Sequence, residues 1–460
     1  MNKFFITTAS DYTNDVVHIG HAYQKILADA LARYHRLIGD KTNFLTGTDE
    51  NGQKVAKSAA EQGLETKDFV DKIAAADQKQ WQCLNISYDR FFRSTDEDHV
   101  KFAREIYLKC KAAGDIYLSK YEGLYCEGCE AYYDESELTD GKCPFHLNKK
   151  IQKLSEDNYF FRLSKYQNFL IDHFGKHPEF VWPESKRNEV LAFIKRGLRD
   201  FSVSRQSLTW GITVPDDPKQ KIYVWFDALL YYLTYGVEEK CWPADVQILG
   251  KDNSKFHAIY WPAMLKSAGY ELPKTILVHD FITLNGQKIS KSLGNVIRPT
   301  ELVKKFGADG VRYYFLRFGP LTNDVDISID KITETYNADL ANGLGNLVAR
   351  IAKLAEKVNY ESRIKNYELW PEVKNYLNNF RVDSALEFVW IKIKKLDRLI
   401  DQNKPWELGD KKLAKFLDKI IPEIQNLAFN LQPFLPATAE KIQKQFTGKI
   451  KSGEPLFPRI

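Results

Sequence analysis

The sequence contains no apolar run that approaches the about 20 residues a membrane-spanning helix needs. It also lacks the charged, apolar and small-residue order of a signal peptide at its start. Only six of the 460 residues are cysteine, too few for a disulfide scaffold, and three of the six cluster, which points to metal binding. We therefore expect a cytoplasmic globular protein that makes no contact with a membrane.

Neither sign of charge dominates, since 66 basic and 61 acidic residues give a net charge of +5. The small excess is unevenly placed. Residues 331–460 hold 22 Lys and Arg against 16 Asp and Glu, whereas the first 330 residues hold 44 against 45. Such a distribution is expected if the C-terminal part meets a polyanion. An evenly solvated, lysine-rich surface is the alternative.

The chain is organised around residues 3–23, which read as an apolar β-branched run, a polar loop, His-Ile-Gly-His and a helical pattern. Apolar residues recur at three- and four-residue spacing from Ala22 to Leu37, so the histidines stand at a helix N-terminus. Free backbone N–H groups and the helix dipole suit such a position to phosphate. Gly20 lets a ring or phosphate approach the backbone. A chance tetrapeptide at an ordinary helix start is the alternative.

A second polar stretch, Lys288-Ile289-Ser290-Lys291-Ser292, follows an Asn-Gly turn far downstream. Two lysines flank small hydroxyl residues on a predicted loop. Lysine is a compact point charge that suits triphosphate oxygens, and a loop can bring it in as negative charge develops. Alone, this stretch is typical of a solvated basic loop, and it gains meaning only beside the histidine stretch.

Cysteine and histidine cluster in an aromatic, turn-rich part of the chain. Cys126 and Cys129 form one knuckle, and Cys143 and His146 form a second. Four such ligands make the tetrahedral set that Zn²⁺ prefers, and a site filled by protein at every position is structural. We expect one Zn²⁺ here. A knuckle held by packing without metal is the alternative.

Strand and helix patterns alternate in the first part of the chain and then give way to helices. Apolar strands end in polar residues near Asp49, Lys251 and His279, which predicts a parallel sheet with its ligands at the strand ends. Asp49 could hold an ammonium group there or simply cap the following helix. A buried strand is predicted from Ile222, running into a helix. Helical patterns at 333–358, 382–401, 413–431 and 437–446 predict an α-helical bundle.

The histidine and lysine stretches, in this order, resemble the HIGH and KMSKS signatures of class I aminoacyl-tRNA synthetases, with Ile289 in place of the usual Met. Within that class the chain resembles the methionyl-tRNA synthetases from end to end. The insertion at about 116–215 is too short for the editing domain of the leucyl, isoleucyl and valyl relatives. Further shared motifs are Gly47-Thr-Asp-Glu, Tyr159-Phe-Phe-Arg162, Val203-Ser-Arg205, Trp225-Phe-Asp-Ala228, Gly250-Lys-Asp252, His257 with Trp261-Pro262, and Asn403-Lys-Pro-Trp406.

The resemblance implies an α/β protein with a split Rossmann-type parallel-sheet catalytic domain, a zinc-knuckle connective insertion and an α-helical bundle that binds the anticodon. The implied boundaries are 1–115 and 216–285 for the two catalytic halves, 116–215 for the insertion, 286–330 for the KMSKS loop and stem-contact region, and 331–460 for the bundle. A monomer is expected, because the extra RNA-binding domain by which some members dimerise does not follow the bundle.

The resemblance also implies a methionine–tRNA ligase. Such an enzyme activates L-methionine with ATP and Mg²⁺, releases pyrophosphate, and transfers methionine to the 3′-terminal ribose of initiator and elongator methionine tRNA. The implied catalytic residues are His18, His21, Lys288 and Lys291, and the ATP-binding residues are Gly20, Lys251, Asp252, Ile289 and Lys291. Methionine would contact Tyr12, Asp49, Trp225, Ala228, Tyr232 and His257. The anticodon would contact Asn346, Arg350 and Trp406, and Cys126, Cys129, Cys143 and His146 would hold zinc.

Five residues depart from the family pattern. Ser10 and Asp11 replace an apolar residue and Pro or Tyr, Asn51 replaces His, Asn253 an aliphatic residue and Asp280 a glycine. They bear on the shape and affinity of the pocket rather than on the class of reaction. The competing hypotheses are a non-catalytic paralogue that binds tRNA or a regulatory partner, and an unrelated His-x-Gly-His nucleotidyltransferase.

Overall fold

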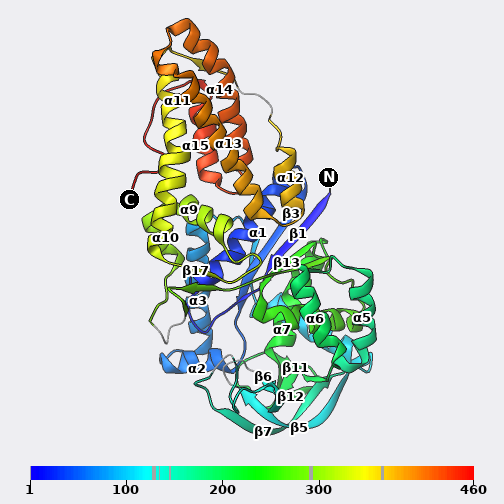
Figure 1. Cartoon of the computed structure of the whole chain (residues 1–460). Coiled ribbons are helices and arrows are strands. Elements are labelled where there is room, and N and C mark those ends of the chain that lie inside the picture. The colour runs from blue at the N-terminus through cyan, green and yellow to red at the C-terminus, as the bar shows by residue number, and fades with distance from the viewer. Residues whose placement is uncertain (1, 127–130, 134, 145–146, 290–293, 364–366) are drawn as a thin grey trace.

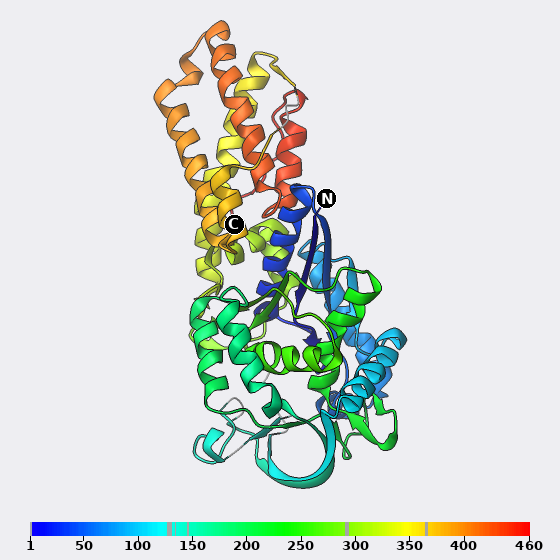
Figure 2. The same cartoon turned by 90° about the vertical axis from the view of Figure 1, so that its right-hand side faces the viewer.

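The protein is described here by a computed structural model, which covers residues 2–126, 131–133, 135–144, 147–289, 294–363 and 367–460. A helical part, a layered α/β part and a strand-rich part follow one another along an elongated molecule (Figures 1 and 2). None of the helices within these ranges is long and apolar enough to cross a membrane.

A parallel sheet forms the centre of the α/β part. Its strands lie in the order β2-β3-β1-β13-β14-β8, with β4 beside β3, and every pairing is parallel. The chain leaves β1 (Lys3–Thr8) for β3 (Lys41–Asp49) on one side and reaches β13 (Val246–Gly250) on the other. The carboxyl end of β1 is therefore the topological switch point, where α/β sheets bind ligands. The other strands are β2 (Asp11–Tyr12), β4 (Arg90–Arg93), β8 (Val181–Trp182) and β14 (Thr275–His279).

Alternate residues of β1 serve two apolar layers. Phe4 and Ile6 pack in one core cluster with α1 (Ile19–Leu37), while Phe5 packs in another with α7 (Val224–Glu238). The sheet is thus covered on both faces, as a parallel sheet requires. Further helices of this part are α2 (Gln53–Glu61), α3 (Thr66–Cys83), α4 (Glu97–Ala112), the π-helical segment Phe256–Tyr260 and α8 (Trp261–Ala268).

The strand-rich part is an antiparallel sheet in the order β6-β5-β7-β9. Its two long strands, β5 (Ile116–Cys126) and β7 (Ile151–Phe161), pair along their whole length and curve together in Figure 2. The stretch between residues 116 and 215 also gives the main sheet its edge strand β8. The remaining elements here are β6 (Ala131–Tyr133), α5 (Gln167–Lys176), α6 (Glu184–Lys195), β9 (Phe201–Ser202), β10 (Ser204–Arg205) and β11 (Thr213–Val214).

The strand predicted from Ile222 was wrong. In the structure β12 (Asp217–Ile222) ends there, pairs antiparallel with β10 and β11, and stays outside the main sheet. The apolar run that follows forms the first turn of α7. The prediction failed because a helix buried on all sides has the same unbroken run of apolar residues as a buried strand. The strands predicted around Ile248 and from Thr275 are confirmed as β13 and β14.

A three-stranded sheet and a long helix lead from the main sheet to the helical part. The small sheet has the order β16-β15-β17 and carries residues 287–289 at the base of the second signature. α9 (Pro299–Phe318) then passes between α1 and the helical part (Figure 1). The strands are β15 (Ile282–Leu284), β16 (Gln287–Lys288) and β17 (Val325–Ile327).

Helices make up most of the C-terminal part, where the sequence predicted an α-helical bundle. The long helical run predicted over 333–358 is continuous, but its middle, Tyr336–Gly345, is π-helical. α13, α14 and α11 pack against one another, and α15 packs against α14. The elements are α10 (Ile329–Thr335), α11 (Asn346–Lys357), α12 (Pro371–Asn378), α13 (Val382–Asn403), α14 (Asp410–Leu431), α15 (Pro436–Gln445), β18 (Glu361–Ser362) and β19 (Gly448–Lys449).

Candidate active site

His18 and His21 lie at the start of α1, where the sequence predicted them. The Nδ1 atom of His18 accepts the backbone N–H of Gly20 (3.0 Å), and the Nδ1 atom of His21 accepts that of His18 (3.1 Å). Since a neutral imidazole carries one hydrogen, each ring holds it on Nε2. Burial, more than any neighbouring charge, lowers the pKa of His18 to about 2 and that of His21 to about 4. Both rings are therefore neutral hydrogen-bond donors, suited to phosphate oxygens.

Gly20 is the point at which the two signature stretches meet. A Cβ atom at this position would lie 2.7 Å from Cε1 of His18 and 4.0 Å from Cδ1 of Ile289. Ile289 is buried, whereas Lys288 beside it is exposed. The second stretch thus rests its apolar residue against the start of α1 and leaves its first lysine in solvent.

The segment after the lysine loop is fastened to the same helix start. The backbone N–H of Ile19 donates to the carbonyl of Ile297 (2.9 Å). The guanidinium of Arg298 donates to the carbonyls of Val16 and Val17. Both sides of the lysine loop therefore contact the histidine loop, although the two lie far apart in the sequence.

Asp49 and Tyr12 are register partners at the ends of β3 and β2. Asp49 is buried, and its backbone carbonyl accepts both the N–H and the hydroxyl of Thr13 (3.0 Å each). Burial raises the pKa of Tyr232, and the negative charge of Asp49 adds to this rise. A buried carboxylate at a strand end beside aromatic rings suits a ligand with an ammonium group and an apolar side chain.

The wall opposite β2 and β3 comes from α7 and the π-helical segment. The Nδ1 atom of His257 lies 3.0 Å from the carbonyl oxygen of Asn253 and must donate to it, so its Nε2 accepts the Tyr232 hydroxyl at 2.7 Å. Trp225 stacks on Phe256, with ring centroids 3.7 Å apart. The contact of Asn253 with His257 is made by its backbone carbonyl and not by its side chain. The six predicted methionine contacts thus come from two neighbouring regions, Tyr12 and Asp49 at the strand ends and Trp225, Ala228, Tyr232 and His257 on the helical wall.

Asp11, which departs from the family pattern, has a partner that the sequence did not predict. Its carboxylate lies 3.1 Å from Nζ of Lys25, and both side chains are almost fully buried. Lys25 also donates to the Thr8 hydroxyl (2.9 Å) and the Ala9 carbonyl (2.7 Å), which uses all three of its N–H bonds. Burial nevertheless outweighs this pairing, since it raises the pKa of Asp11 and lowers that of Lys25.

Asn51, another departure, belongs to a buried polar chain. Its amide donates to Asp227 (2.5 Å), and the other Asp227 oxygen lies 2.6 Å from Nε2 of His99. The Nδ1 atom of His99 lies 3.1 Å from the hydroxyl of Thr234, which itself donates to the Leu230 carbonyl. Sequence reasoning missed Asp227 and His99. The only signal was the position of Asp227 inside the Trp225-Phe-Asp-Ala228 motif.

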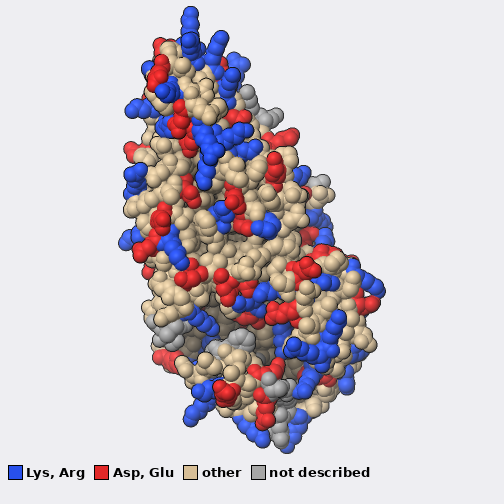
Figure 3. Space-filling view, in the orientation of Figure 1, with Lys and Arg blue, Asp and Glu red and all other residues tan. Residues whose placement is uncertain are grey.

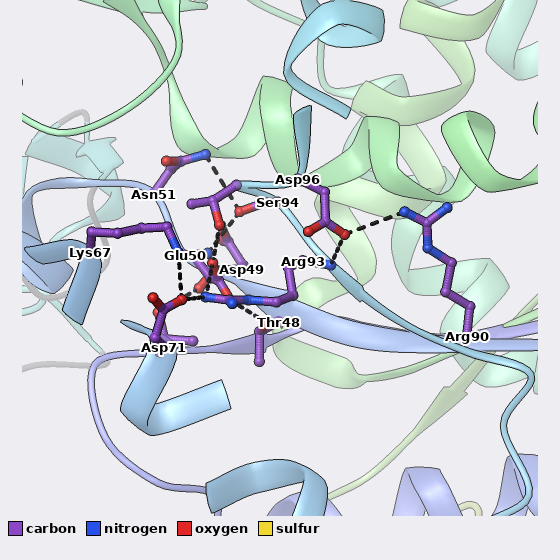
Figure 4. A network of polar contacts seen from close by, with 12 residues as sticks. Thr48, Asp49, Glu50, Asn51, Lys67, Asp71, Arg90, Arg93, Ser94 and Asp96 are labelled. Carbon is purple, nitrogen blue, oxygen red and sulfur yellow. Dashed lines mark hydrogen bonds and ion pairs between the residues drawn. The ribbon is translucent and has the colours of Figure 1, made fainter. Parts of the chain in front are cut away.

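A further polar network lies directly behind Asp49 and was also missed (Figure 4). The neighbouring Glu50 is fully buried, and its carboxylate accepts two hydrogen bonds from Arg93 (2.6 and 3.0 Å). Arg93 also reaches Asp71 at 2.5 Å. The indole of Trp210 donates to the Glu50 carbonyl (2.7 Å). These bonds fix the turn that follows β3 and with it the position of Asp49.

Lys251, predicted to bind ATP, is held by two carboxylates. Its Nζ lies 2.6 Å from Asp324 and 3.3 Å from Asp280. Asp280 stands where the family has glycine, is buried, and also pairs with Lys186 at 2.8 Å. Asp252, the other predicted ATP contact here, is exposed beside Lys251. A nucleotide phosphate that binds Lys251 must therefore compete with Asp324 and Asp280.

Three predicted site residues lie outside the described part of the chain: Lys291 of the lysine loop, and Cys129 and His146 of the two knuckles. Their described partners are Lys288, and Cys126 and Cys143. Both of these cysteines are fully buried. Among the described residues no group of three His, Cys, Asp or Glu side chains is placed to hold a metal ion.

The three residues predicted to read the anticodon lie on the bundle. Asn346 and Arg350 stand one turn apart on α11, and the guanidinium carbon of Arg350 is 5.6 Å from the centroid of the Trp406 ring. Trp406 is 47% exposed. Asn346 is exposed and lines a shallow groove that Phe457 also lines. The structure therefore joins Arg350 to Trp406 and places Asn346 close by on the same helix.

An open groove lies at the opposite, amino-terminal edge of the main sheet. It is lined by the starts of β1, β13 and β14 and by His35, His173 and His177. No predicted site residue lines this groove. The candidate site is therefore the carboxyl edge, where both signatures meet.

Comparison with known proteins agrees with this geometry. The family model described as "tRNA synthetases class I (M)" matches residues 4–154 and 146–352. A "Methionine--tRNA ligase" from Caldanaerobacter subterraneus subsp. tengcongensis is 39% identical over 503 residues, which covers 99% of this chain and 79% of that protein. The chain belongs to the class I methionyl-tRNA synthetases. A second relative of the same name, from Thermosynechococcus vestitus, is 41% identical and covers 99% of this chain and 92% of its own.

Solved structures of this family share the fold. Mycobacterium tuberculosis methionyl-tRNA synthetase in complex with methionyl-adenylate superimposes with a TM-score of 0.92 at 35% identity, covering 100% of both chains. The apo form of the M. tuberculosis enzyme gives a TM-score of 0.82 at 32% identity and covers 100% of this chain and 98% of that one. The α/β fold with a parallel sheet is therefore that of the family.

Proposed function

We propose that the chain activates L-methionine with ATP at the carboxyl edge of the parallel sheet and then charges initiator and elongator methionine tRNA. The observation that carries this proposal is the pair of neutral Nε2–H donors at the start of α1, with Ile289 of the second signature packed beside Gly20. Backbone N–H groups at the start of α1 and two imidazole donors suit the place where the α-phosphate would lie.

The chemistry asks for positioning and charge stabilisation rather than for a covalent intermediate on the protein. A methionine carboxylate oxygen attacks the α-phosphorus in line, a new oxygen–phosphorus bond forms, and the bond from the α-phosphorus to the bridging oxygen breaks, so that pyrophosphate leaves. His18 and His21 donate to the α-phosphate oxygens, and Lys288 and Lys291 bring positive charge as it is needed. Mg²⁺ enters with ATP as part of the substrate. The terminal ribose hydroxyl of the tRNA then attacks the adenylate carbonyl. An ester bond forms, the bond between the carbonyl carbon and the phosphate oxygen breaks, AMP leaves, and the hydroxyl proton passes to the released phosphate or to solvent.

The two substrates use different sides of this edge. The nucleotide subsite is bordered by Gly20 and by the backbone at Ile289. Lys251 and Asp252 lie next to it, at the end of β13. Asp49 takes the methionine ammonium. The thioether lies among Tyr12, Trp225, Ala228, Tyr232 and His257, where the Tyr232–His257 hydrogen bond holds two of the wall residues in place.

The partners of the departing residues support an active enzyme over a decayed paralogue. Asp11 pairs with Lys25, Asn51 binds Asp227, and Asp280 pairs with Lys186.

One structural Zn²⁺ on Cys126, Cys129, Cys143 and His146 is part of the proposal. The donor set supports it, since two thiolates and further sulfur and nitrogen ligands form a closed tetrahedral site. The complete burial of Cys126 and Cys143 fits a site with no open position for substrate. When bound, the metal would hold the turn after β5 and stabilise the insertion.

The bundle is proposed to bind the anticodon stem and loop. Unstacked bases are read by aromatic and guanidinium planes, which Trp406 and Arg350 supply, and by amide groups such as that of Asn346. Basic side chains gather over the bundle end in Figure 3 and suit phosphate contacts. Those exposed on α13 and α14 are Lys394, Lys395, Arg398, Lys411, Lys412, Lys415 and Lys419.

Pyrophosphate exchange measured with each of the twenty amino acids tests the proposal. We expect ATP–pyrophosphate exchange with methionine, followed by charging of methionine tRNA when the tRNA is added. Exchange with another amino acid but not with methionine would refute the substrate. No exchange at all from folded protein would favour the non-catalytic paralogue.

A further inference from the structure

Arg312 of α9 is bonded to the catalytic half and to the bundle at the same time. Its guanidinium lies 2.7 Å from Asp29 of α1, and both side chains are 0% exposed. The same group donates to the carbonyls of Phe434 (2.8 Å) and Pro433 (3.3 Å), which lie between α14 and α15. One side chain thus joins the helix that carries the signature histidines to the connection between two bundle helices.

A second buried residue of α9 strengthens its hold on the bundle. Asp309, nearly one turn before Arg312, accepts the backbone N–H of Thr438 at the start of α15 (2.6 Å). Farther along α9, Arg317 pairs with Glu387 of α13 at 3.0 Å, and this pair is less buried, at 22% and 53% exposed. The buried hydrogen bonds from α9 to residues 433–438 therefore come from Asp309 and Arg312.

α9 is also tied to α1 at the catalytic end. Just before α9, Ile297 and Arg298 bind the loop that ends in His18, as described above. Asp29 lies about two turns after His21 on α1. The two helices are thus joined near the reacting end by Arg298 and near the bundle by Arg312.

The Asp29–Arg312 pair is a complete one. Burial works against the charge on Asp29, but Arg312 and Arg33 outweigh it and lower its pKa. The remaining Asp29 oxygen accepts the N–H and the hydroxyl of Ser87 (2.6 Å each). Loss of either partner would leave the other charge buried and uncompensated, so the pair holds α1 and α9 together.

We propose that Arg312 is a positioning residue that couples tRNA held on the bundle to the adenylate end of α1 during methionine transfer. This inference rests on the proposed function. When tRNA binds the bundle, residues 433–438 move and displace α9. The displacement of α9 moves α1 and the residues that flank the lysine loop, because both are hydrogen-bonded to α9 or to the residues just before it. Methionine activation, which needs no tRNA, does not use the coupling.

Arg312→Lys tests the inference. Lysine keeps a charge for Asp29 but lacks the planar fork that reaches the two carbonyls as well. We expect pyrophosphate exchange within about twofold of the unmodified chain and a fall in the aminoacylation rate of about tenfold, within the range of measured couplings. Arg317→Gln is the matched control, since it removes a bundle contact of the same helix, and it should change neither rate.

A double variant separates coupling from simple weakening. If Arg312 transmits the anticodon contact, Trp406→Ala should cost aminoacylation clearly less in the Arg312→Lys background than in the unmodified chain. Costs that multiply independently overturn the inference. So does an equal fall in exchange and aminoacylation with a lower melting temperature, which would mark Arg312 as merely structural.

A second variant keeps the test decisive if the first does not fold. If Arg312→Lys does not fold, Asp309→Asn replaces it, because it weakens the bond to Thr438 without touching Asp29. The coupling then predicts a selective fall in aminoacylation of about threefold, and an unchanged ratio of aminoacylation to exchange overturns it. If the unmodified chain charges no tRNA, the proposed function fails as well. If it charges tRNA and the variant effects are independent, only the coupling fails.

Discussion

Arg350 of α11 lies over the indole ring of Trp406, with the guanidinium carbon 5.6 Å from the ring centroid. The guanidinium is also anchored by Asp401 at 2.8 Å, so its position is fixed from both sides. An exposed indole backed by a cation is a stacking platform for an unpaired base. The pair gives the bundle a defined spot at which an anticodon base can dock.

Replacing Trp406 by Ala should therefore lower aminoacylation and leave methionine activation intact. Loss of one stacked base costs about 1–3 kcal/mol. The measurement is the aminoacylation kcat/KM for tRNA beside the rate of pyrophosphate exchange. Ile391→Ala is the control, because Ile391 is a comparably exposed apolar residue of the same bundle, on α13. Normal charging by folded Trp406→Ala protein would show that the anticodon is read elsewhere.

Gly20→Ala should abolish most methionine activation without unfolding the protein. The added Cβ would lie 2.7 Å from the His18 ring, so that ring must move away from the phosphate position. A displacement of this order costs about 10²-fold in rate. Gly175→Ala is the control, because a Cβ there meets nothing within 4 Å. Exchange by Gly20→Ala at the unmodified rate would remove His18 from the reaction.

Tyr232→Phe should raise the KM for methionine by about tenfold and change kcat little. The variant keeps the ring but leaves the buried Nε2 of His257 without its donor, a loss of about 1–2 kcal/mol. Tyr235→Phe, on the same helix, removes a hydroxyl that binds Asn43 away from the pocket and serves as control. A KM unchanged by Tyr232→Phe and raised by Tyr235→Phe would contradict the assigned pocket.

Purified protein should contain one Zn²⁺ per chain, and Cys143→Ser should lose it. Removal of the metal should expose the stretch 116–215 to proteolysis while methionine activation falls less, because the knuckle lies outside the candidate site. Cys241→Ser is the control, since Cys241 is a buried cysteine remote in sequence from the knuckles. Less than a few tenths of a zinc per chain would favour a knuckle held by packing alone.

Stability should fall as the pH drops from 7 towards 4. Burial lowers the pKa of His21, His257 and His279 to about 4 each, whereas an unfolded histidine titrates near 6.5. Below about pH 6.5 these histidines bind protons in the unfolded chain but not in the folded one. Each of them therefore lowers the free energy of unfolding by about 1.4 kcal/mol per pH unit until the pH reaches its folded pKa. Urea unfolding at pH 7, 6 and 5 measures this slope. His257→Gln should make the slope shallower, and a flat profile would contradict the burial of these rings.

Local pattern was enough to predict the elements that position the site. The spacing of Ile26, Leu27 and Leu31 predicted α1, and the polar residues after short apolar runs predicted where β3, β13 and β14 end. Both signals are local, because periodicity and turn residues lie within one element. The bundle helices were predicted for the same reason.

The partners of buried charges could not be predicted. Asp11 needs Lys25, Asp227 needs His99, and Asp29 needs Arg312, and each pair joins separate elements. Composition shows only that such residues exist, and in most proteins they lie in solvent. Residues that break the family pattern at 11, 51 and 280 were visible in the sequence, but what compensates each of them is a property of the folded chain.

The hydrogen positions on His18 and His21 leave no room for proton transfer. In each ring Nδ1 already accepts a backbone N–H and Nε2 already carries a hydrogen, so neither ring can remove a proton from a substrate. Methionine must therefore arrive with its carboxylate already ionised, and the imidazoles act as fixed dipoles. The first half of the reaction is therefore a nucleotidyl transfer in which neither imidazole gains or loses a proton.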